Sequence, residues 1–370
     1  MSGYYKKAVL DYIKILTTIL VVFCGGIFIS DPYQLFHVHW VRSGVIYNNL
    51  RVQNYALVKY YDFDSIIMGT SMLENTAADS ASKQLGGTWA NLSMSSATYY
   101  EKYTVLDYAM RNKNIRRVIM SLDDKFDAWN HVNNTFDVDL YSGKDTWTVK
   151  LRQYTNKKAL RCIFLNYKCR FVDDDLNHPN AWFNSSGHAR RFGGFDNWLK
   201  VADTDSQIKA AFDILLDCPN NDVPYLTSGG LGDADVIIND LLVPMVKDNP
   251  SVQFEFVIPP YSALYWAKSL DYFDEKMTLY ANLVHRLDKF DNVRIYWFYD
   301  ADFVFDIAMY KDLTHYHQSV NEMMLHFIRD GRAVVEANNI DAKIDDFRQK
   351  LDAFDLDFYI RQIKQYRQCM

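Results

Sequence analysis

The sequence lacks the features that mark several large classes of protein. It has only five cysteines, at spacings that metal sites do not use, and no internal repeat. Its formal net charge is −6, so it has no excess of Lys and Arg with which to hold a polyphosphate backbone. These absences argue against a cysteine-based metal domain, a repeat array and a nucleic-acid-binding protein. We predict no metal ion and no cofactor.

Apolar and aromatic side chains, in contrast, are abundant. Hydrophobic residues make up 49% of the 370 residues and aromatic residues 15%, which is enough for a sizeable core and argues against disorder of the whole chain. The length suits one large α/β domain with insertions. The 26 Tyr and 23 Phe fit ordinary core packing or aromatic surfaces that stack on sugars.

A long apolar segment lies near the N-terminus. Residues 8–29 read AVLDYIKILTTILVVFCGGIFI, and their only charges, Asp11 and Lys14, lie near the start. As a helix this segment is about 33 Å long, enough to cross a bilayer core, with Lys14 reaching the headgroups. Lys6 and Lys7 favour an N-terminus inside the cell. No small-residue cleavage site follows, which favours an anchor that is retained.

These features define the predicted membrane topology. Residues 1–7 form a cytoplasmic tail, residues 8–30 form a single-pass signal anchor in the cell membrane, and the bulk of the chain is extracytoplasmic, either periplasmic or extracellular. The alternative is a helix buried in a core, because the uncharged part, residues 15–29, is short for a full span. In an oxidising compartment Cys162 and Cys169 can form a disulfide, a pairing that the sequence leaves open.

Beyond this segment, short apolar runs alternate with helical patterns. Residues 31–61 are mixed and aromatic and are expected to form a membrane-proximal connector. Buried strands are predicted for five runs: residues 63–68, 89–92, 118–122, 254–258 and 293–298. Amphipathic helices are predicted around residues 99–110, 235–246 and 320–328. This alternation predicts a doubly wound α/β fold with a mostly parallel five-stranded sheet.

Two segments depart from the alternation. About residues 130–230 the chain is polar and irregular, and we expect a long insertion at the active edge of the sheet, serving as a lid or a substrate platform. The domain itself is predicted to span residues 62–331. In the tail, residues 332–370, apolar residues spaced 4-3-4-3-4 predict one amphipathic helix, packed on its own domain or on a partner helix. They are Ile340, Ile344, Phe347, Leu351, Phe354 and Phe358.

A serine follows the first predicted strand on a turn that contains glycine. In Gly69-Thr70-Ser71 the serine lies where a helix is expected to start, so that its own N–H can face a developing oxyanion. The competing interpretation is a capping box, in which Ser71 and Glu74 only begin that helix. The motif by itself does not separate a nucleophile from a cap.

A second motif comes just before the last helix of the domain. Asp312 and His315, three residues apart on a loop, can place a carboxylate beside an imidazole, fix the tautomer of the ring and stabilise the imidazolium. His315 can also be an ordinary exposed loop histidine, and His317 can exchange roles with it. A strand-end serine together with a late Asp-x-x-His predicts a serine acyl-transfer triad of Ser71, His315 and Asp312.

Together these motifs resemble the SGNH (GDSL-like) hydrolase superfamily over about residues 62–331, without the insertion. Gly69-Thr70-Ser71 is similar to the nucleophile block of the family. Residues 91–98 (NLSMSSAT) are similar to its second block, and Asp312-Leu-Thr-His315 is similar to its closing Asp-x-x-His. The resemblance implies a flavodoxin-like arrangement of the sheet.

The resemblance also implies roles for individual residues. Ser71 matches the nucleophile, His315 the general base and Asp312 the carboxylate that orients it. Tyr261 and Ser262, which follow the fourth predicted strand, match a substrate-side loop of membrane-anchored bacterial members.

The chain departs from the family pattern at the residues that stabilise the oxyanion. Ser96 stands where the second block has glycine, and Asp123 stands where the third block has asparagine. An ionised carboxylate cannot donate to an oxyanion, and the loss of one donor costs roughly 2.7–4 kcal/mol of transition-state stabilisation. The backbone N–H of Ser96 and the side chains of Asn75 and Asn91 are the candidate replacements.

The single anchor, the insertion and the missing asparagine resemble the extracytoplasmic proteins that work with membrane-bound O-acyltransferases. This implies an esterase or acyltransferase that moves acyl groups, of the O-acetyl type, on a cell-surface polysaccharide through an acyl-Ser71 intermediate, with a membrane-bound O-acyltransferase as partner. Two alternatives stay open. One is a non-catalytic binding or assembly module that kept the fold, and the other is a metal-dependent phosphoesterase that uses Asp123, Asp124 and Asp312.

Overall fold

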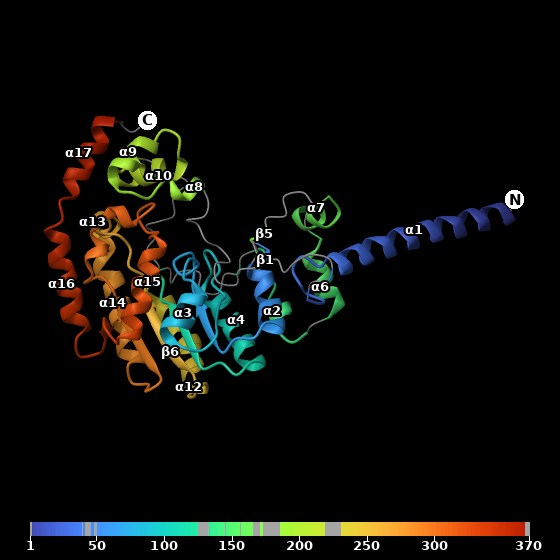
Figure 1. Cartoon of the computed structure of the whole chain (residues 1–370), viewed down its shortest axis with the longest axis horizontal. Helices are drawn as coiled ribbons and strands as arrows, with labels where there is room; N and C mark the ends of the chain where they lie inside the picture. Colours follow the sequence, from blue (N-terminus) through green and yellow to red (C-terminus); the bar gives the residue numbers. More distant parts are fainter. Residues whose placement is uncertain are drawn as a thin grey trace. The chain divides into compact units, whose positions relative to one another are not determined.

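The computed structural model describes residues 2–38, 40, 46–47, 50–124, 132, 134–144, 146–155, 157–165, 171–172, 186–218 and 231–366. The chain, whose elements are labelled in Figure 1, divides into two compact units. The N-terminal unit contains Met1–Tyr61 and Asn134–Asp175, and the sheet unit contains Asp62–Asn133 and Leu176–Met370. The predicted insertion is therefore shared between the two units.

The sheet unit is built on a six-stranded sheet with the order β3-β2-β4-β6-β7-β8. Its strands are β2 (Ser65–Met68), β3 (Trp89–Asn91), β4 (Arg117–Ser121), β6 (Gln253–Ile258), β7 (Val293–Trp297) and β8 (Val334–Val335). The first five in this order are parallel, and β8 pairs antiparallel with β7. The predicted α/β fold with a mostly parallel sheet is confirmed. The predicted number of five strands is wrong, because the two-residue β8 adds a sixth.

The central strands are apolar on both faces. Ile66 and Ile67 are neighbours in β2 and point to opposite faces, and both are fully buried. Strands of this kind need helices on both faces of the sheet. The main helices are α3 (Ala78–Leu85), α4 (Tyr99–Asn112), α13 (Ala263–Lys268), α14 (Leu270–Leu287) and α15 (Gln318–Arg329).

The helix predicted at residues 235–246 contains a π-helical segment. Helix α11 (Leu231–Val236) continues into η1 (Ile237–Leu242) and then into α12 (Val243–Asp248), whose first turn contains Pro244. Proline has no N–H, so the α-helical hydrogen bond that position 244 would donate cannot form. The N–H of Val243 instead donates to the carbonyl of Ile238, five residues back.

The tail forms two helices and not the single helix predicted. Helices α16 (Ile340–Asp352) and α17 (Leu356–Tyr366) are separated where Asp355 accepts a hydrogen bond from the N–H of Phe358. Helix α16 contacts α13 and α14 (Figure 1). Its Phe347 is fully buried. The rings around Phe347 are those of Trp266, Phe273, Trp297, Tyr299 and Phe305. The tail is thus part of the core of the sheet unit.

The second part of the predicted insertion forms three short helices, α8 (Ser186–Ala189), α9 (Phe195–Val201) and α10 (Ser206–Leu215). Asp205 caps α10, and its carboxylate also forms ion pairs with Arg190 and Arg191. The N–H of Gly193 donates to the carbonyl of Ala308, so these helices adjoin the loop that leads to Asp312.

Several cysteines bear on the predicted disulfide. Cys169 and the side chain of Cys162 lie outside the described residues, as do residues 173–185 and 219–230 of the insertion. The pairing of Cys162 with Cys169 therefore stays a prediction. Cys218, which follows α10, is disulfide-bonded, and Cys24 in the N-terminal helix is free.

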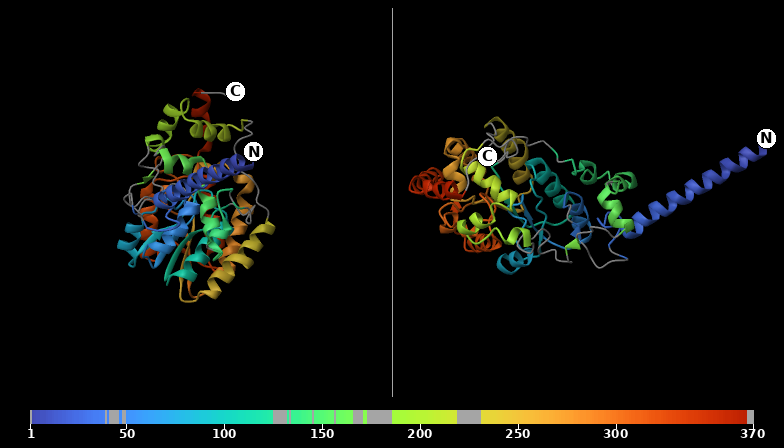
Figure 2. Two further views of the ribbon diagram at one scale, coloured as in Figure 1. Left: turned by 90° about the vertical axis from the view of Figure 1, so that its right-hand side faces the viewer. Right: turned by 90° about the horizontal axis from the view of Figure 1, so that it is seen from above.

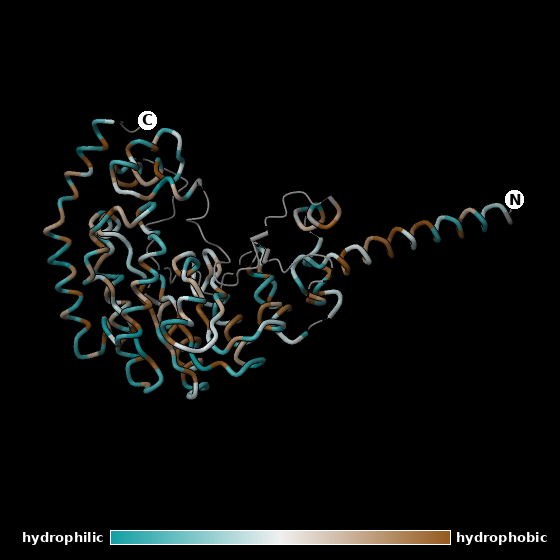
Figure 3. The backbone as a smooth tube through the Cα atoms, in the orientation of Figure 1, coloured by the Kyte–Doolittle hydropathy of each residue, from teal (hydrophilic) through white to brown (hydrophobic). Residues whose placement is uncertain are grey.

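The N-terminal unit begins with α1 (Ser2–Ser30), in which Tyr4–Ser30 is long and apolar enough to cross a membrane. Figure 2 shows α1 as one continuous helix, and Figure 3 shows hydrophobic residues over most of its length. Its side chains are exposed from Tyr4 to Phe23. The alternative of a helix buried in a core does not describe this exposed stretch.

The other elements of the N-terminal unit are smaller, and one of them, α7 (Lys157–Leu165), contacts α1. They are α2 (Leu50–Tyr60), α5 (Val138–Tyr141), α6 (Trp147–Gln153), α7 and the antiparallel pair of β1 (Ile46–Tyr47) and β5 (Phe171–Val172). Asp31 stops α1, and its carboxylate accepts hydrogen bonds from the N–H groups of Leu35 and Phe36 and from the hydroxyl of Tyr154. The predicted connector therefore contains helix α2 and folds together with the first part of the insertion.

Candidate active site

The candidate residues lie on loops that follow parallel strands, the edge at which α/β sheets place their ligand sites. Strand β2 ends at Met68, and Gly69 begins a tight turn. A Cβ at position 69 would lie 2.8 Å from the Cβ of Leu73 and 2.9 Å from the Oγ of Ser121, so only glycine fits there. This turn places Ser71 at the edge of the sheet.

Ser71 does not begin a helix. Residues 71–75 form turns, and α3 starts only at Ala78. A capping box does occur in this region, but between Thr98 and Glu101 at the start of α4. The hydroxyl of Ser71 is hydrogen-bonded to His315 instead. A capping role therefore does not account for this serine.

Three side chains form a continuous hydrogen-bonded chain. The Oγ of Ser71 lies 2.9 Å from Nε2 of His315, and Nδ1 of His315 lies 2.9 Å from each carboxylate oxygen of Asp312. Because Nδ1 donates its proton to the carboxylate, Nε2 is the nitrogen that accepts from the hydroxyl. The structure thus brings together the three residues predicted to act together, although Ser71 and His315 are 244 positions apart.

The two ends of the loop that carries Asp312 and His315 are paired with each other. Tyr310 and Tyr316 form an antiparallel bridge across it. Within the loop, the Asp312 carboxylate accepts hydrogen bonds from the N–H groups of Thr314 (3.0 Å) and His315 (2.8 Å). These bonds orient the carboxylate toward the imidazole.

The loop after β6 supports this closed loop. The hydroxyl of Ser262 donates to the carbonyl of Leu313 at 2.5 Å, and the same side chain caps α13. The hydroxyl of Tyr261 donates to Asp124 at 3.2 Å. The two residues predicted on a substrate-side loop therefore have buried side chains that bond to the protein itself.

Asp312 is held in its ionised form. Its carboxylate lies 3.7 Å from Nζ of Lys311, in addition to its contacts with His315. Burial raises the pKa of Asp312, but His315 and Lys311 outweigh burial and hold that pKa below the usual range of a carboxyl group. An ionised carboxylate in this place stabilises a protonated His315 ring.

A second histidine, His188 of α8, lies at the same site and was not found from the sequence. Its Nδ1 lies 3.4 Å from Nζ of Lys311 and 3.3 Å from Nη1 of Arg191. Both neighbours are donors, so Nδ1 is the acceptor and the ring proton is on Nε2. Burial, Lys311 and Arg191 lower the pKa of His188 to about 4, which makes the ring neutral at pH 7. The only sequence signal was the run SGHARR in the insertion.

Two backbone N–H groups at this edge, those of Ser71 and Ser96, are candidates for binding an oxyanion. Ser96, on the turn after β3, is exposed and has a left-handed φ of 52°, a conformation that costs a non-glycine residue about 1–2 kcal/mol. The N–H of Met94 donates to the carbonyl of Gly69, which links this turn to the turn of Ser71. Within the described parts of the chain, the N–H groups of Ser71 and Ser96 donate to no other residue.

The two asparagines proposed as replacement donors are buried. The side-chain Nδ2 of Asn91 donates to the carbonyls of Leu73 and Thr76, at 2.8 Å each, so both of its hydrogens are used. Asn75 lies between Leu73 and Thr76, the two residues whose carbonyls Asn91 binds, and is itself buried. Asn91 thereby fixes the chain that follows Ser71.

Asp123 is engaged in a buried ion pair. Nζ of Lys102, a side chain with 0% exposure, lies 2.8 Å from its carboxylate. The hydroxyls of Thr70 (2.6 Å) and Ser121 (2.7 Å) also donate to it. Burial raises the pKa of Asp123, but Lys102 and the two hydroxyls outweigh burial and lower it. The carboxylate therefore fixes Thr70, the residue before Ser71, and does not act as an oxyanion donor.

The three carboxylates considered for a metal-dependent phosphoesterase are each bound by protein groups. Asp123 pairs with Lys102, Asp312 pairs with His315, and Asp124 accepts hydrogen bonds from Tyr261 and Tyr265. Within the described ranges, no group of three or more His, Cys, Asp or Glu is arranged to hold a metal ion.

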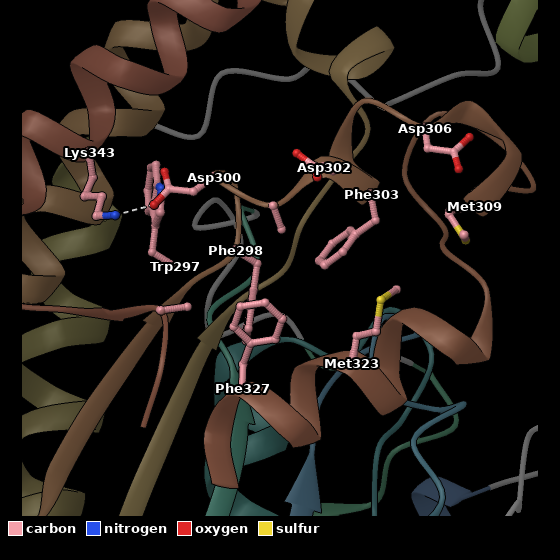
Figure 4. A pocket seen from close by; sticks show the side chains of 12 residues that line it. Trp297, Phe298, Asp300, Asp302, Phe303, Asp306, Met309, Met323, Phe327 and Lys343 are labelled. Carbon is pink, nitrogen blue, oxygen red and sulfur yellow. Dashed lines mark hydrogen bonds and ion pairs between the residues drawn. The ribbon is translucent and has the colours of Figure 1, made fainter. Parts of the chain in front are cut away.

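A separate cavity of about 580 Å³ lies beside the segment that leads to the Asp312 loop, and its size is typical of ligand pockets. Asp302 and Asp306 lie at its rim, and Asp300 forms an ion pair with Lys343 (Figure 4). Its apolar walls include Phe298, Phe303, Met309, Met323 and Phe327. The three residues of the hydrogen-bonded chain do not line it.

No protein-family model matches this sequence, and no protein of curated function is similar to it at a significant level. Any assignment of function therefore depends on the geometry of the site.

Proposed function

We propose that this chain is a membrane-anchored serine esterase or O-acyltransferase of the SGNH type, which moves acyl groups of the O-acetyl kind on a cell-surface polysaccharide. The observation that carries the proposal is the hydrogen-bonded chain from Ser71 through His315 to Asp312, with 2.9 Å at each step. A helix cap or an exposed loop histidine does not require this alignment, whereas activation of a hydroxyl nucleophile does.

In the proposed reaction, the Oγ of Ser71 attacks the acyl carbon of a bound ester while Nε2 of His315 takes up the hydroxyl proton. The bond between that carbon and the alcohol oxygen of the donor then breaks, and His315 returns the proton to the leaving alcohol. A sugar hydroxyl or water releases the acyl group from Ser71 by the same steps. Asp312 keeps the ring in the required tautomer and stabilises the imidazolium.

We assign the developing oxyanion to the N–H groups of Ser71 and Ser96. The two turns are joined by the hydrogen bond between Met94 and Gly69, and neither amide is used elsewhere in the described chain. Backbone donors of this kind stabilise tetrahedral intermediates because they are oriented before the reaction begins. This assignment needs no side chain at position 123.

We further propose that α1 anchors the chain and that the site faces the outside of the cell. The apolar length of α1, the charges of Lys6 and Lys7 and the disulfide at Cys218 all support this orientation. An anchored enzyme on this side has access to surface polymers and to a membrane-bound O-acyltransferase, which we propose as its partner and acyl source.

The test is turnover of an activated acetyl ester by the full chain in detergent or nanodiscs. We expect Ser71→Ala and His315→Ala each to remove activity, and a serine-directed fluorophosphonate to label wild type but not Ser71→Ala. Ser80→Ala on α3 and the exposed His326→Ala on α15 are matched controls that retain activity. Absence of both turnover and labelling in folded wild-type protein contradicts the proposal.

The second candidate function is a non-catalytic binding or assembly module for a surface-polymer modification complex. It is favoured by one observation, namely that Ser96 carries a side chain at a left-handed position and makes close approach of a substrate harder than glycine does. This candidate predicts polymer binding that Ser71→Ala leaves unchanged. A mass increase on Ser71 after exposure to an acyl donor argues against it.

A further inference from the structure

The length of α1 determines which residues lie at membrane depth. A hydrocarbon core of about 30 Å takes about 20 helical residues. Counted from Ala8, the first residue after the Lys6-Lys7 pair, this span ends near Ile27. Counted from the uncharged residues after Lys14, it extends to the end of α1. Both counts place the last two turns of α1 within or just below the headgroups.

The N-terminal unit packs on these same two turns. Helix α7 contacts α1, and the ring of Phe164 stacks on Phe23, with centroids 5.5 Å apart. A Cβ at Gly26 would lie 2.9 Å from the ring of Phe164, so glycine permits this close approach. Phe164 nevertheless stays 45% exposed. Helix α7 therefore shares the depth of the α1 residues that it contacts.

An aromatic cluster continues from the end of α1. Phe28 contacts the rings of Trp147 and Trp40, at 5.4 Å and 5.5 Å between centroids, and Phe36 contacts Trp147 at 4.7 Å. Trp40 and Trp147 are 63% and 60% exposed. Large exposed indoles beside a membrane-spanning helix are typical of the interfacial layer, where an amphipathic ring is stabilised.

The charge of this region complements a lipid headgroup layer. Residues 31–61 and 134–175 carry 11 Lys and Arg against 7 Asp and Glu, although the whole chain is acidic. Lys157 and Arg161 of α7 are exposed on the helix that carries Phe164. A helix with basic and apolar faces is suited to lie at the surface of a membrane with anionic lipids.

We propose that α7 and the cluster of Phe28, Phe36, Trp40 and Trp147 form a lipid-contacting platform, inserted in the interfacial layer of the leaflet in which α1 ends. The occupant of this surface is the bilayer itself, because the surface is continuous with the exposed apolar side of α1. The inference rests on the proposed anchor and is independent of the proposed chemistry at Ser71.

The test uses the full chain in bilayers that contain phosphatidylcholine with a nitroxide quencher just below the headgroup. We expect quenching of tryptophan fluorescence in wild type, a part of which is lost in Trp147→Phe and in Trp40→Phe and a larger part in the double variant. Trp266→Phe, which changes a fully buried tryptophan of the sheet unit, is the matched control and leaves the quenched part unchanged.

A second measurement needs no substitution. A photoactivatable lipid with its reactive group near the headgroup is expected to label peptides from residues 36–40 and 147–165, but none from α16. Protein that stays in the bilayer with no difference in quenching between wild type and the double variant overturns the platform alone, and the surface then faces water or a protein partner. Protein that leaves the bilayer overturns the anchor and the platform together.

Discussion

The two units of the chain differ in charge and in where they place their aromatic residues. The N-terminal unit has 14 Lys and Arg against 8 Asp and Glu, a net charge of +6, whereas the sheet unit has 26 against 38, a net charge of −12. The first exposes Trp40 and Trp147, while the second buries Trp266 and Trp297. Under the function and the anchor proposed above, attachment belongs to the first unit and chemistry to the second, so we expect that each can be lost without the other.

The largest expected effect is a loss of esterase activity that leaves membrane attachment unchanged. Asp312→Asn keeps the size of the side chain but removes the charge that orients His315, and we expect kcat/KM for an activated ester to fall by about 10⁴-fold. Retention of the chain in vesicles should not change, because α1 is untouched. Steady-state kinetics and vesicle flotation measure the two properties. A fall of less than about 10-fold would show that Asp312 does not act through His315.

A buried ring in the tail tests whether the sheet unit includes α16. We expect Phe347→Ala to lower the free energy of unfolding by about 3–5 kcal/mol, because it leaves a cavity among five aromatic rings. Phe358→Ala on α17, where the ring is half-exposed, is the matched control and should cost less than about 1 kcal/mol. Urea unfolding followed by near-UV circular dichroism measures both. Equal effects would place α16 outside the cooperative unit.

The buried ion pair of Lys102 and Asp123, beside the turn that carries Ser71, gives an effect of similar or smaller size. Asp123→Asn leaves the ammonium of Lys102 buried without its counter-charge, and we expect a loss of roughly 3–5 kcal/mol of stability. Asp107→Asn removes a carboxylate from the exposed pair with Arg111 and should cost about 0–1 kcal/mol. If the two variants unfold at the same urea concentration, the buried pair does not stabilise the site.

The smallest expected effect is a pH dependence of stability in the sheet unit. His188 has a pKa of about 4 in the folded chain, below the ordinary value of 6.5, so the unfolded chain takes up the proton first as the pH falls. Its contribution is therefore complete above about pH 6.5 and is lost between about pH 6.5 and 4. We expect His188→Asn to reduce the change of the urea unfolding midpoint with pH over that range. His285→Asn, at an exposed position of α14, is the matched control and should leave the pH dependence of the midpoint unchanged. An unaltered slope in His188→Asn would contradict this.

The parallel strands could be read from the sequence because each is a continuous apolar run, as in Ile66 and Ile67. Strands of two residues, such as β8, are too short to produce a pattern and form only because a neighbouring edge offers hydrogen bonds. The break between α16 and α17 was missed for a related reason. Apolar spacing continues across residues 353–355, while Asp355 bonds to Phe358 and starts a new helix.

The site was predictable only in part. The motifs around Ser71 and His315 suggested that the two residues meet, since loops after parallel strands share one edge. The partners that fix them were not predictable, because His188 and Lys311 are 123 positions apart, and Lys102 of α4 and Asp123 after β4 are 21 positions apart. Contacts of this kind depend on how helices lie on the sheet and leave no periodic signal in the chain.

The pair of Lys102 and Asp123 also constrains how this sequence can change over generations. An asparagine at position 123 leaves a buried lysine without its counter-charge, and an apolar residue at position 102 leaves a buried carboxylate without one. A single substitution at either position therefore gives a less stable protein. The two positions should therefore co-vary among homologues, with an amide at 123 appearing alongside an uncharged residue at 102.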